Sequence, residues 1–143
     1  MLFRSCPFES LSKAVEEMRK KTPIIIVDFH AEATSEKQAI GAYLDGKVSV
    51  VYGTHTHVIT ADERVQENGT GFICDIGMTG SENSILGMEK GPVLHRFLTQ
   101  MPARFEPSQD PPFIINGIKV TVDTDTGKAE SMTRIQERYS SIK

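Results

Sequence analysis

Two short apolar runs, neither broken by regular polar alternation, constrain the fold of this 143-residue chain more than any other feature. The first covers residues 24–29 (IIIVDF) and the second covers residues 48–52 (VSVVY). β-Branched runs of this length without alternation are typical of strands that are covered on both faces. We therefore expect two central strands of a parallel sheet.

A helix is expected between these strands, from Ser35 to Asp45. Its inner face has apolar residues at helical spacing, Ser35 and Gln38 have the spacing of a capping box, and Gly46 follows as a stop signal. A strand, a helix and a strand within about thirty residues form a βαβ unit, whose crossover is right-handed. The fold class is therefore α/β.

Weaker patterns place the remaining elements within a single domain over residues 1–143. Alternation of apolar and polar residues predicts strands near the C-terminus, and helical spacing predicts two more helices. The expected elements are helices over residues 7–21 and 92–99, a strand over 71–74, a proline-rich connection over 101–112, and a C-terminal β-hairpin of strands over 118–122 and 129–136.

Composition excludes several classes of protein. Hydrophobic residues make up 38% and charged residues 24%, which suits a folded domain rather than a disordered chain. The net charge is −3 and no lysine or arginine run occurs, so no basic nucleic-acid-binding patch is expected. The longest apolar run is too short to cross a membrane, and no secretory signal is recognised. With only two cysteines, read as reduced thiols, a cytoplasmic location is expected.

Three histidines share one expected position in this fold. His30 follows the first predicted strand directly, and His55 and His57 follow the second. Ligands of open parallel sheets bind outside the carboxyl ends of the strands. Residues two apart in extended backbone point the same way, so both His55 and His57 can face this volume. We expect the three imidazoles to converge there.

Imidazole is the commonest side-chain metal ligand, and it suits zinc, iron, manganese or nickel. Asp28, Glu32, Thr54 and Thr56 lie beside the histidines in the sequence and are expected to orient the rings through hydrogen bonds. A simpler interpretation stays open at this point. A His-x-His pair also occurs by chance on surface strands, Asp28 can act as a turn cap, and Glu32 can be a solvated loop charge.

Four segments that contain or follow these residues carry a family resemblance. They are Val27-Asp-Phe-His-Ala-Glu-Ala-Thr-Ser-Glu-Lys37, Val51-Tyr-Gly-Thr-His-Thr-His-Val58, Asp75-Ile-Gly-Met-Thr-Gly80 and Leu86-Gly-Met88, in this order. Together they resemble the YmdB-like branch of the calcineurin-like metallophosphoesterases, which are bacterial cyclic-nucleotide phosphodiesterases. The similarity runs from about Cys6 to the end of the chain.

The resemblance implies a fold, a metal site and a substrate. The fold would be the carboxy-terminal half of a sandwich of two mixed β-sheets flanked by helices. His30 and His55 would bind one metal ion of a pair and His57 the other, with iron, manganese or zinc as the metals. The substrate would be a cyclic nucleotide or a similar phosphoester, hydrolysed by water that the metal pair activates.

Other parts of the family's site have no counterpart in these residues. No Gly-Asp-x-Val, Gly-Glu-Asn or Gly-Asn-His segment occurs, so the carboxylate ligands and the general-acid histidine are missing. Three imidazoles shared by two cations leave both underfilled, because a stable site needs about four ligands. We therefore predict a truncated domain with little phosphodiesterase activity alone. An exposed apolar sheet edge should favour self-association, so a homo-oligomer is expected.

Two alternatives remain open from the sequence. The chain can be a non-catalytic interaction module or regulatory remnant that pairs with a partner through its open surface. It can also be a hydrolase with a single zinc ion that His30, His55 and His57 surround.

Overall fold

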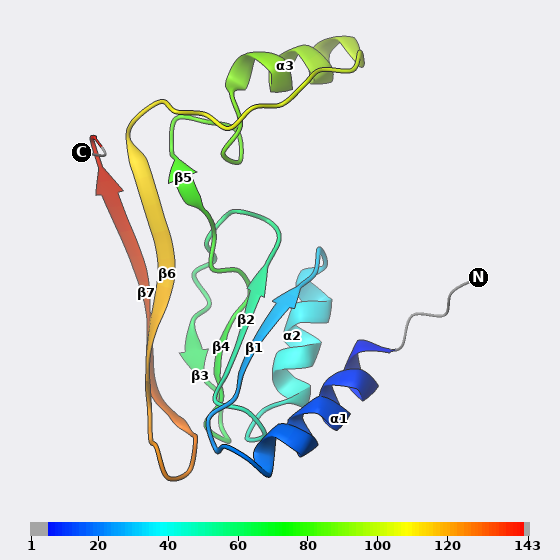
Figure 1. Ribbon diagram of the computed structural model, residues 1–143, viewed down its shortest axis with the longest axis vertical. Helices are drawn as coiled ribbons and strands as arrows, with labels where there is room; N and C mark the ends of the chain where they lie inside the picture. The colour runs from blue at the N-terminus through cyan, green and yellow to red at the C-terminus, as the bar shows by residue number, and fades with distance from the viewer. Residues whose placement is uncertain (1–5, 142–143) are drawn as a thin grey trace.

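Residues 6–141 of the chain are described by a computed structural model, so residues 1–5 and 142–143 of the predicted domain lie outside the described part. In chain order the elements are α1 (Pro7–Arg19), β1 (Ile26–His30), α2 (Thr34–Tyr43), β2 (Val50–Thr54), β3 (Arg64–Val65), β4 (Gly71–Ile73), β5 (Thr79–Ser81), α3 (Lys90–Thr99), β6 (Phe113–Val122) and β7 (Ala129–Tyr139). Figure 1 shows three layers: α1 and α2, a central sheet, and the long β6–β7 hairpin on the other side.

The central sheet confirms the predicted βαβ unit. Its strand order is β1-β2-β4-β3, and β1, β2 and β4 run parallel to one another. In the register of β1 and β2, Ile26 pairs with Val50 and His30 pairs with Thr54. The carboxyl ends of the two strands therefore lie side by side, and the residues that follow β2 emerge next to His30.

Two apolar clusters hold the layers together. The first lies between the helices and the sheet, and its fully buried members include Ile40, Leu44, Val51 and Phe72. The second, centred on Val50, Ile73 and Met132, lies between the two sheets. Both faces of β2 are thus covered, which explains why its sequence shows no polar alternation.

Helix α2 begins one residue earlier than predicted, and the capping-box prediction is wrong. Ala33 occupies the N-cap position and no side chain caps the helix. Ser35 therefore lies inside the first turn, where its hydroxyl cannot accept the amide hydrogen bonds of a capping residue. The predicted stop is close to correct, because the helix ends at Tyr43 and Gly46 adopts a positive φ of 77°.

A second, antiparallel sheet has the strand order β5-β6-β7. The predicted C-terminal hairpin is confirmed, but β6 begins at Phe113 rather than at residue 118, and β7 continues to Tyr139. The short strands β3 and β5 were not predicted, since two or three residues carry too little pattern to identify a strand. The proline-rich stretch 101–112 does connect α3 to β6.

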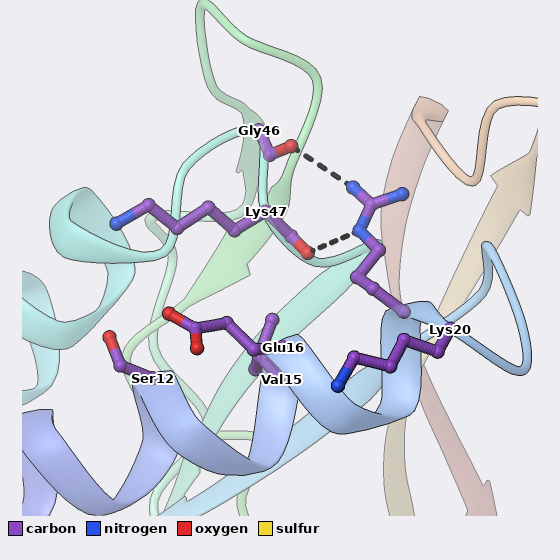
Figure 2. A pocket seen from close by; sticks show the side chains of 7 residues that line it. Ser12, Val15, Glu16, Lys20, Gly46 and Lys47 are labelled. Carbon is purple, nitrogen blue, oxygen red and sulfur yellow. Dashed lines mark hydrogen bonds between the residues drawn. The ribbon is translucent and has the colours of Figure 1, made fainter.

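Arg19 fastens α1 to the rest of the domain. Its guanidinium donates to the carbonyl oxygens of Lys47 and Gly46, at 3.0 Å and 3.1 Å. Figure 2 shows these two contacts at the edge of an open pocket beside Ser12 and Glu16. The three cationic groups of this pocket therefore have partners. Arg19 holds the 46–47 turn, Lys20 pairs with Glu17 at 2.6 Å, and Nζ of Lys47 lies 4.2 Å from the centre of the Tyr43 ring.

Several apolar side chains remain exposed. Strand β1 is an edge strand, and Ile26 on it is 60% exposed. Helix α3 stands away from the central sheet in Figure 1, and its Phe97 and Leu98 are 78% and 83% exposed. Among residues 6–141, none of the helices has the length and apolarity needed to cross a membrane.

Candidate functional site

The predicted convergence of His30 and His55 is present at the tips of β1 and β2. The two ring centroids are 4.9 Å apart, and the rings meet edge to face at 84°. Nε2 of His30 lies 3.0 Å from Nδ1 of His55. Two nitrogen ligands of one zinc ion are separated by about 3 to 3.4 Å, because each zinc–nitrogen bond is about 2.0 to 2.1 Å. The pair therefore has the spacing of two ligands of one cation.

A chain of hydrogen bonds fixes the His30 ring. The Thr54 hydroxyl donates to Oδ1 of Asp28 at 2.8 Å. Because its proton is used there, the same hydroxyl accepts a hydrogen bond from Nδ1 of His30, at 3.0 Å. This network assigns the proton of the neutral His30 ring to Nδ1 and leaves the lone pair on Nε2. The free nitrogen is the one that faces His55.

Glu32 fixes the His55 ring by binding the ring nitrogen that faces away from His30. Its Oε2 lies 2.5 Å from Nε2 of His55, so this nitrogen carries a proton and donates it. In the neutral ring, the lone pair is then on Nδ1, which faces His30. Two nitrogens in this position either share one proton or bind a common cation. Carboxylates that fix the outer nitrogen of a histidine are a regular feature of metal sites.

His57 is held separately from this pair. Its Nδ1 donates to the backbone carbonyl of Leu86 at 3.1 Å, which again leaves Nε2 free. Within residues 6–141, no group of three or more His, Cys, Asp or Glu side chains is arranged to hold a metal ion. The structure thus brings the rings of His30 and His55 together, whereas the ring of His57 contacts the Leu86 carbonyl. A single zinc ion held by all three histidines does not match this arrangement.

The loop that carries His55 and His57 has an unusual backbone. The φ angles of the two residues are 115° and 65°, so the extended backbone expected for this pair was wrong. Side-chain-bearing residues rarely adopt this region. Such a conformation costs about 1 to 3 kcal/mol per residue and persists only where surrounding contacts enforce it. Strained backbone of this kind is concentrated at functional sites.

Asp75 supplies the contacts that enforce the loop conformation. Its carboxylate accepts hydrogen bonds from the amides of Thr56 and Gly77, each at 2.9 Å. It also forms a buried ion pair with Lys37 of α2, in which Nζ and Oδ2 are 2.9 Å apart. Asp75 is 0% exposed and Lys37 only 2%. The loop is therefore tied through its middle residue to the interior of the domain.

The environment keeps Asp75 ionised. Burial alone would raise the pKa of this carboxyl, but the hydrogen bonds from Lys37, Thr56 and Gly77 lower the pKa below its usual value. The preceding residue behaves oppositely, because burial and the nearby Asp62 raise the pKa of the Cys74 thiol to about 11. Cys74 therefore stays protonated at neutral pH, in the form that is a poor nucleophile.

Gly53 allows β2 to pass close to the segment that carries Asp75. A Cβ atom at this position would lie 1.8 Å from the Cys74 carbonyl oxygen and 2.8 Å from a side-chain carbon of Lys37. The Gly53 carbonyl accepts the amide of Ile76 at 3.0 Å. The glycine before Thr54 and His55 is therefore required by packing.

The sequence predicted most of the polar partners but missed the ion pair. Asp28, Glu32 and Thr54 lie where they orient the rings, whereas Thr56 contacts Asp75 through its backbone and no histidine ring. Lys37 was not predicted, although one signal was available. It precedes Ile40, Gly41 and Leu44 at helical spacing, so it falls on the buried face of α2. A lysine on a buried face needs a partner.

Fold and site together define a class of protein. It is an α/β protein with histidines gathered outside the carboxyl ends of parallel strands, where a strand tip carries one of them and a loop with positive φ angles carries the others.

Comparison with known proteins identifies the family. The family described as YmdB-like protein matches residues 1–135, and the chain therefore belongs to it. It is 46% identical over 129 residues to a protein named 2′,3′-cyclic-nucleotide 2′-phosphodiesterase from Bacillus subtilis, and 37% identical over 123 residues to a putative phosphatase/phosphodiesterase from Mycoplasma pneumoniae. These alignments cover 90% and 85% of this chain.

Solved structures confirm the fold. A hypothetical protein from Thermus thermophilus matches 97% of this chain and 53% of its own, with a TM-score of 0.87 at 37% identity. A novel phosphatase from Mycoplasma pneumoniae matches 98% of this chain and 50% of its own, with a TM-score of 0.87 at 33% identity. The chain spans about half the length of the relatives it matches, which is 48% and 43% for the two curated relatives above.

Proposed function

We propose that this chain supplies part of the active site of a metal-dependent phosphodiesterase or phosphatase that acts on cyclic nucleotides or similar phosphoesters. The observation that carries the proposal is the pair of facing nitrogens in His30 and His55, each with its outer nitrogen fixed by an oxygen partner. The names of the relatives, which include a cyclic-nucleotide phosphodiesterase, support the substrate class.

In this proposal each side chain has a defined task. Nε2 of His30 and Nδ1 of His55 would hold one metal ion, and Nε2 of His57 would hold a second. Asp28, through Thr54, and Glu32 would keep the first two rings in the ligating orientation and add negative charge beside the cations. A metal pair of iron, manganese or zinc supplies activation of water and charge stabilisation in phosphoester hydrolysis.

The set of ligands is incomplete within residues 6–141, where no three-residue metal group is present. A cation with two imidazole ligands needs roughly two more protein or water ligands. We therefore expect weak metal binding and little turnover from the 143 residues alone. The general acid that protonates the leaving group is not assigned to any of these residues.

A metal titration tests the ligand assignment directly. NMR titration of the purified chain with Zn²⁺ should shift the ring signals of His30 and His55 together, and His30→Ala or His55→Ala should abolish the common response. His95→Ala is the matched control, because His95 is exposed on α3. Zinc binding that survives both site substitutions would reject the proposal. So would brisk hydrolysis of 2′,3′-cyclic AMP that is unaffected by His55→Ala.

The exposed apolar surface favours a second candidate function, that of an interaction module. Phe97 and Leu98 on α3 and Ile26 on the edge of the sheet are the most exposed large apolar residues of the described part. Exposed apolar surface of this kind commonly marks interaction sites. A stable complex with another protein, together with no detectable metal binding, would favour this function over hydrolysis.

A further inference from the structure

A second hollow adjoins the histidine site, and His57 is the one residue of its lining that the ligand assignment above uses. It has a volume of about 390 Å³, and His57 lies at its edge. Its walls are largely apolar and include Met78, Leu86, Met88 and Phe113. We call this hollow the Met pocket. Among the described residues, no Asp, Glu, Lys or Arg lines it, so a phosphate group would find no lysine or arginine partner there.

The wall next to His57 is a tight turn closed by backbone hydrogen bonds. Ile85 and Met88 exchange two backbone hydrogen bonds, at 2.9 Å and 3.0 Å, and enclose a two-residue turn. Both residues of the turn have positive φ, 52° at Leu86 and 89° at Gly87, as in a type I′ hairpin turn. Leucine is unfavourable in such a position, which usually takes Gly, Asn or Asp. The turn nevertheless places a half-exposed leucine at the pocket and directs its carbonyl to His57.

The floor of the pocket is also held by polar contacts. Ser108 donates its amide to the Gly87 carbonyl at 2.8 Å, and its hydroxyl lies 3.3 Å from that of Ser81. Both serines are buried. The 84–88 turn, β5 and the segment before β6 therefore form one connected frame, and the pocket does not depend on a loose loop.

The chemistry of the walls defines the group that fits. Methionine thioethers and a phenylalanine ring are polarisable and pack well against flat aromatic surfaces. Thr79 and Gln109 add uncharged hydrogen-bonding groups to the lining. A neutral, flat heterocycle with hydrogen-bonding edges satisfies both properties, whereas an ion or a flexible aliphatic chain satisfies only one.

The position of the pocket fits the same interpretation. His55 and His57 are two residues apart, so their backbones are separated by at most about 7 Å. One ribose spans a comparable distance between its phosphate and its base. A nucleotide whose phosphate lies at the His30–His55 pair can therefore place its base beside His57.

We propose that the Met pocket binds the nucleobase of the substrate. This inference rests on the proposed function for its phosphate end, but it makes a separate claim that needs no metal ion. The bare nucleoside should bind here without metal, while a sugar phosphate that lacks a base should not.

The experiment uses methyl NMR of the whole 143-residue chain with labelled methionines, titrated with adenosine in the presence of EDTA. Met78 and Met88 should shift, and Met18 and Met132, which lie on α1 and β7, should not. Ribose 5-phosphate should shift none of them. Adenosine shifts that are absent at Met78 and Met88, or spread evenly over all the methionines, would overturn the proposal.

A matched pair of substitutions tests the wall itself. Leu86→Asn removes the apolar side chain but suits the positive φ, so the fold should be kept while adenosine binding weakens roughly fivefold. Leu98→Asn, on the exposed face of α3, is the control and should leave binding unchanged. Unaltered binding by Leu86→Asn would reject the pocket. Zinc binding without adenosine binding would reject only this inference, and the converse result would reject only the metal assignment.

Discussion

The two sides of the histidine site are built in different ways. His30 is the last residue of β1, so regular strand hydrogen bonds position its backbone and only its ring needs support, which Thr54 and Asp28 provide at the surface. His55 and His57 lie on a loop with positive φ angles, whose backbone depends on the buried Asp75. The position of His30 therefore depends on strand hydrogen bonds and surface contacts, whereas the positions of His55 and His57 depend on the buried Lys37–Asp75 ion pair.

Because of this difference, we expect substitutions on the loop side to change the stability of the domain and substitutions on the strand side to change metal binding. On the loop side, the group that shapes the site is 0% exposed and also links α2 to the sheet region, so altering it affects the whole domain. On the strand side, the supporting side chains are only partly buried or exposed, and Asp28 contacts Thr54 and the neighbouring Tyr52, so altering them affects the surface around the His30 ring. Substitutions on the two sides should therefore differ in kind.

The largest effect is expected from Asp75→Ala. The substitution leaves Lys37 as an unpaired buried cation and removes the acceptor for the Thr56 amide, so the free energy of unfolding should fall by about 3 to 5 kcal/mol. Urea denaturation measures this. Asp28→Ala, on the strand side, is the comparison and should cost less than about 1 kcal/mol. Equal losses at the two positions would contradict this distinction between the two sides.

A double substitution shows whether the unpaired charge causes that loss. Lys37→Met combined with Asp75→Ala removes the buried cation, while the amides of Thr56 and Gly77 still lack their acceptor. This variant should be more stable than Asp75→Ala alone. If it is not, the ion pair has no special role and the lost hydrogen bonds account for the effect.

A smaller effect, on binding rather than stability, is expected from Thr54→Val. Valine has nearly the same shape but no hydroxyl, so His30 loses its link to Asp28 while the strand is kept. Loss of such supporting partners typically weakens metal binding 10- to 100-fold. Zinc titration monitored by NMR measures the change, with thermal unfolding as a check of the fold. Thr56→Val is the matched control, since Thr56 touches no histidine ring, and wild-type affinity in Thr54→Val would refute the network.

The smallest effect compares glycine with alanine at the two histidines. At position 55 the φ of 115° suits glycine, so His55→Gly should be more stable than His55→Ala by about 1 kcal/mol. At position 30, inside a strand, the order should be reversed by about 0.5 to 1 kcal/mol. Thermal unfolding of the four variants gives both differences. A His55→Ala variant that is as stable as His55→Gly, or more stable, would show that the loop is not strained.

The sequence predicted those parts of the fold that depend on local periodicity. The strands around Val27 and Val51 and the register that places His30 beside the next strand follow from uninterrupted apolar runs and βαβ geometry. The contact between His57 and Leu86 was not predictable, because 29 residues separate them and the turn uses a leucine where turn rules favour glycine or asparagine. The identity of the three histidines was thus predictable from the sequence, whereas the backbone conformation of His55 and His57 and the contact of His57 with Leu86 were not.

Gly53 limits how far this site can be redesigned. The threonines and histidines that follow Gly53 carry the polar groups of the site, so an engineer would choose this segment for random mutagenesis. Yet any larger residue at 53 would collide with the Cys74 carbonyl and displace Lys37. In a library of folded variants, the positions beside 53 should therefore tolerate several residues, whereas position 53 should be glycine in every case. A transfer of these histidines to another scaffold must also include this glycine and the backbone carbonyl that it faces.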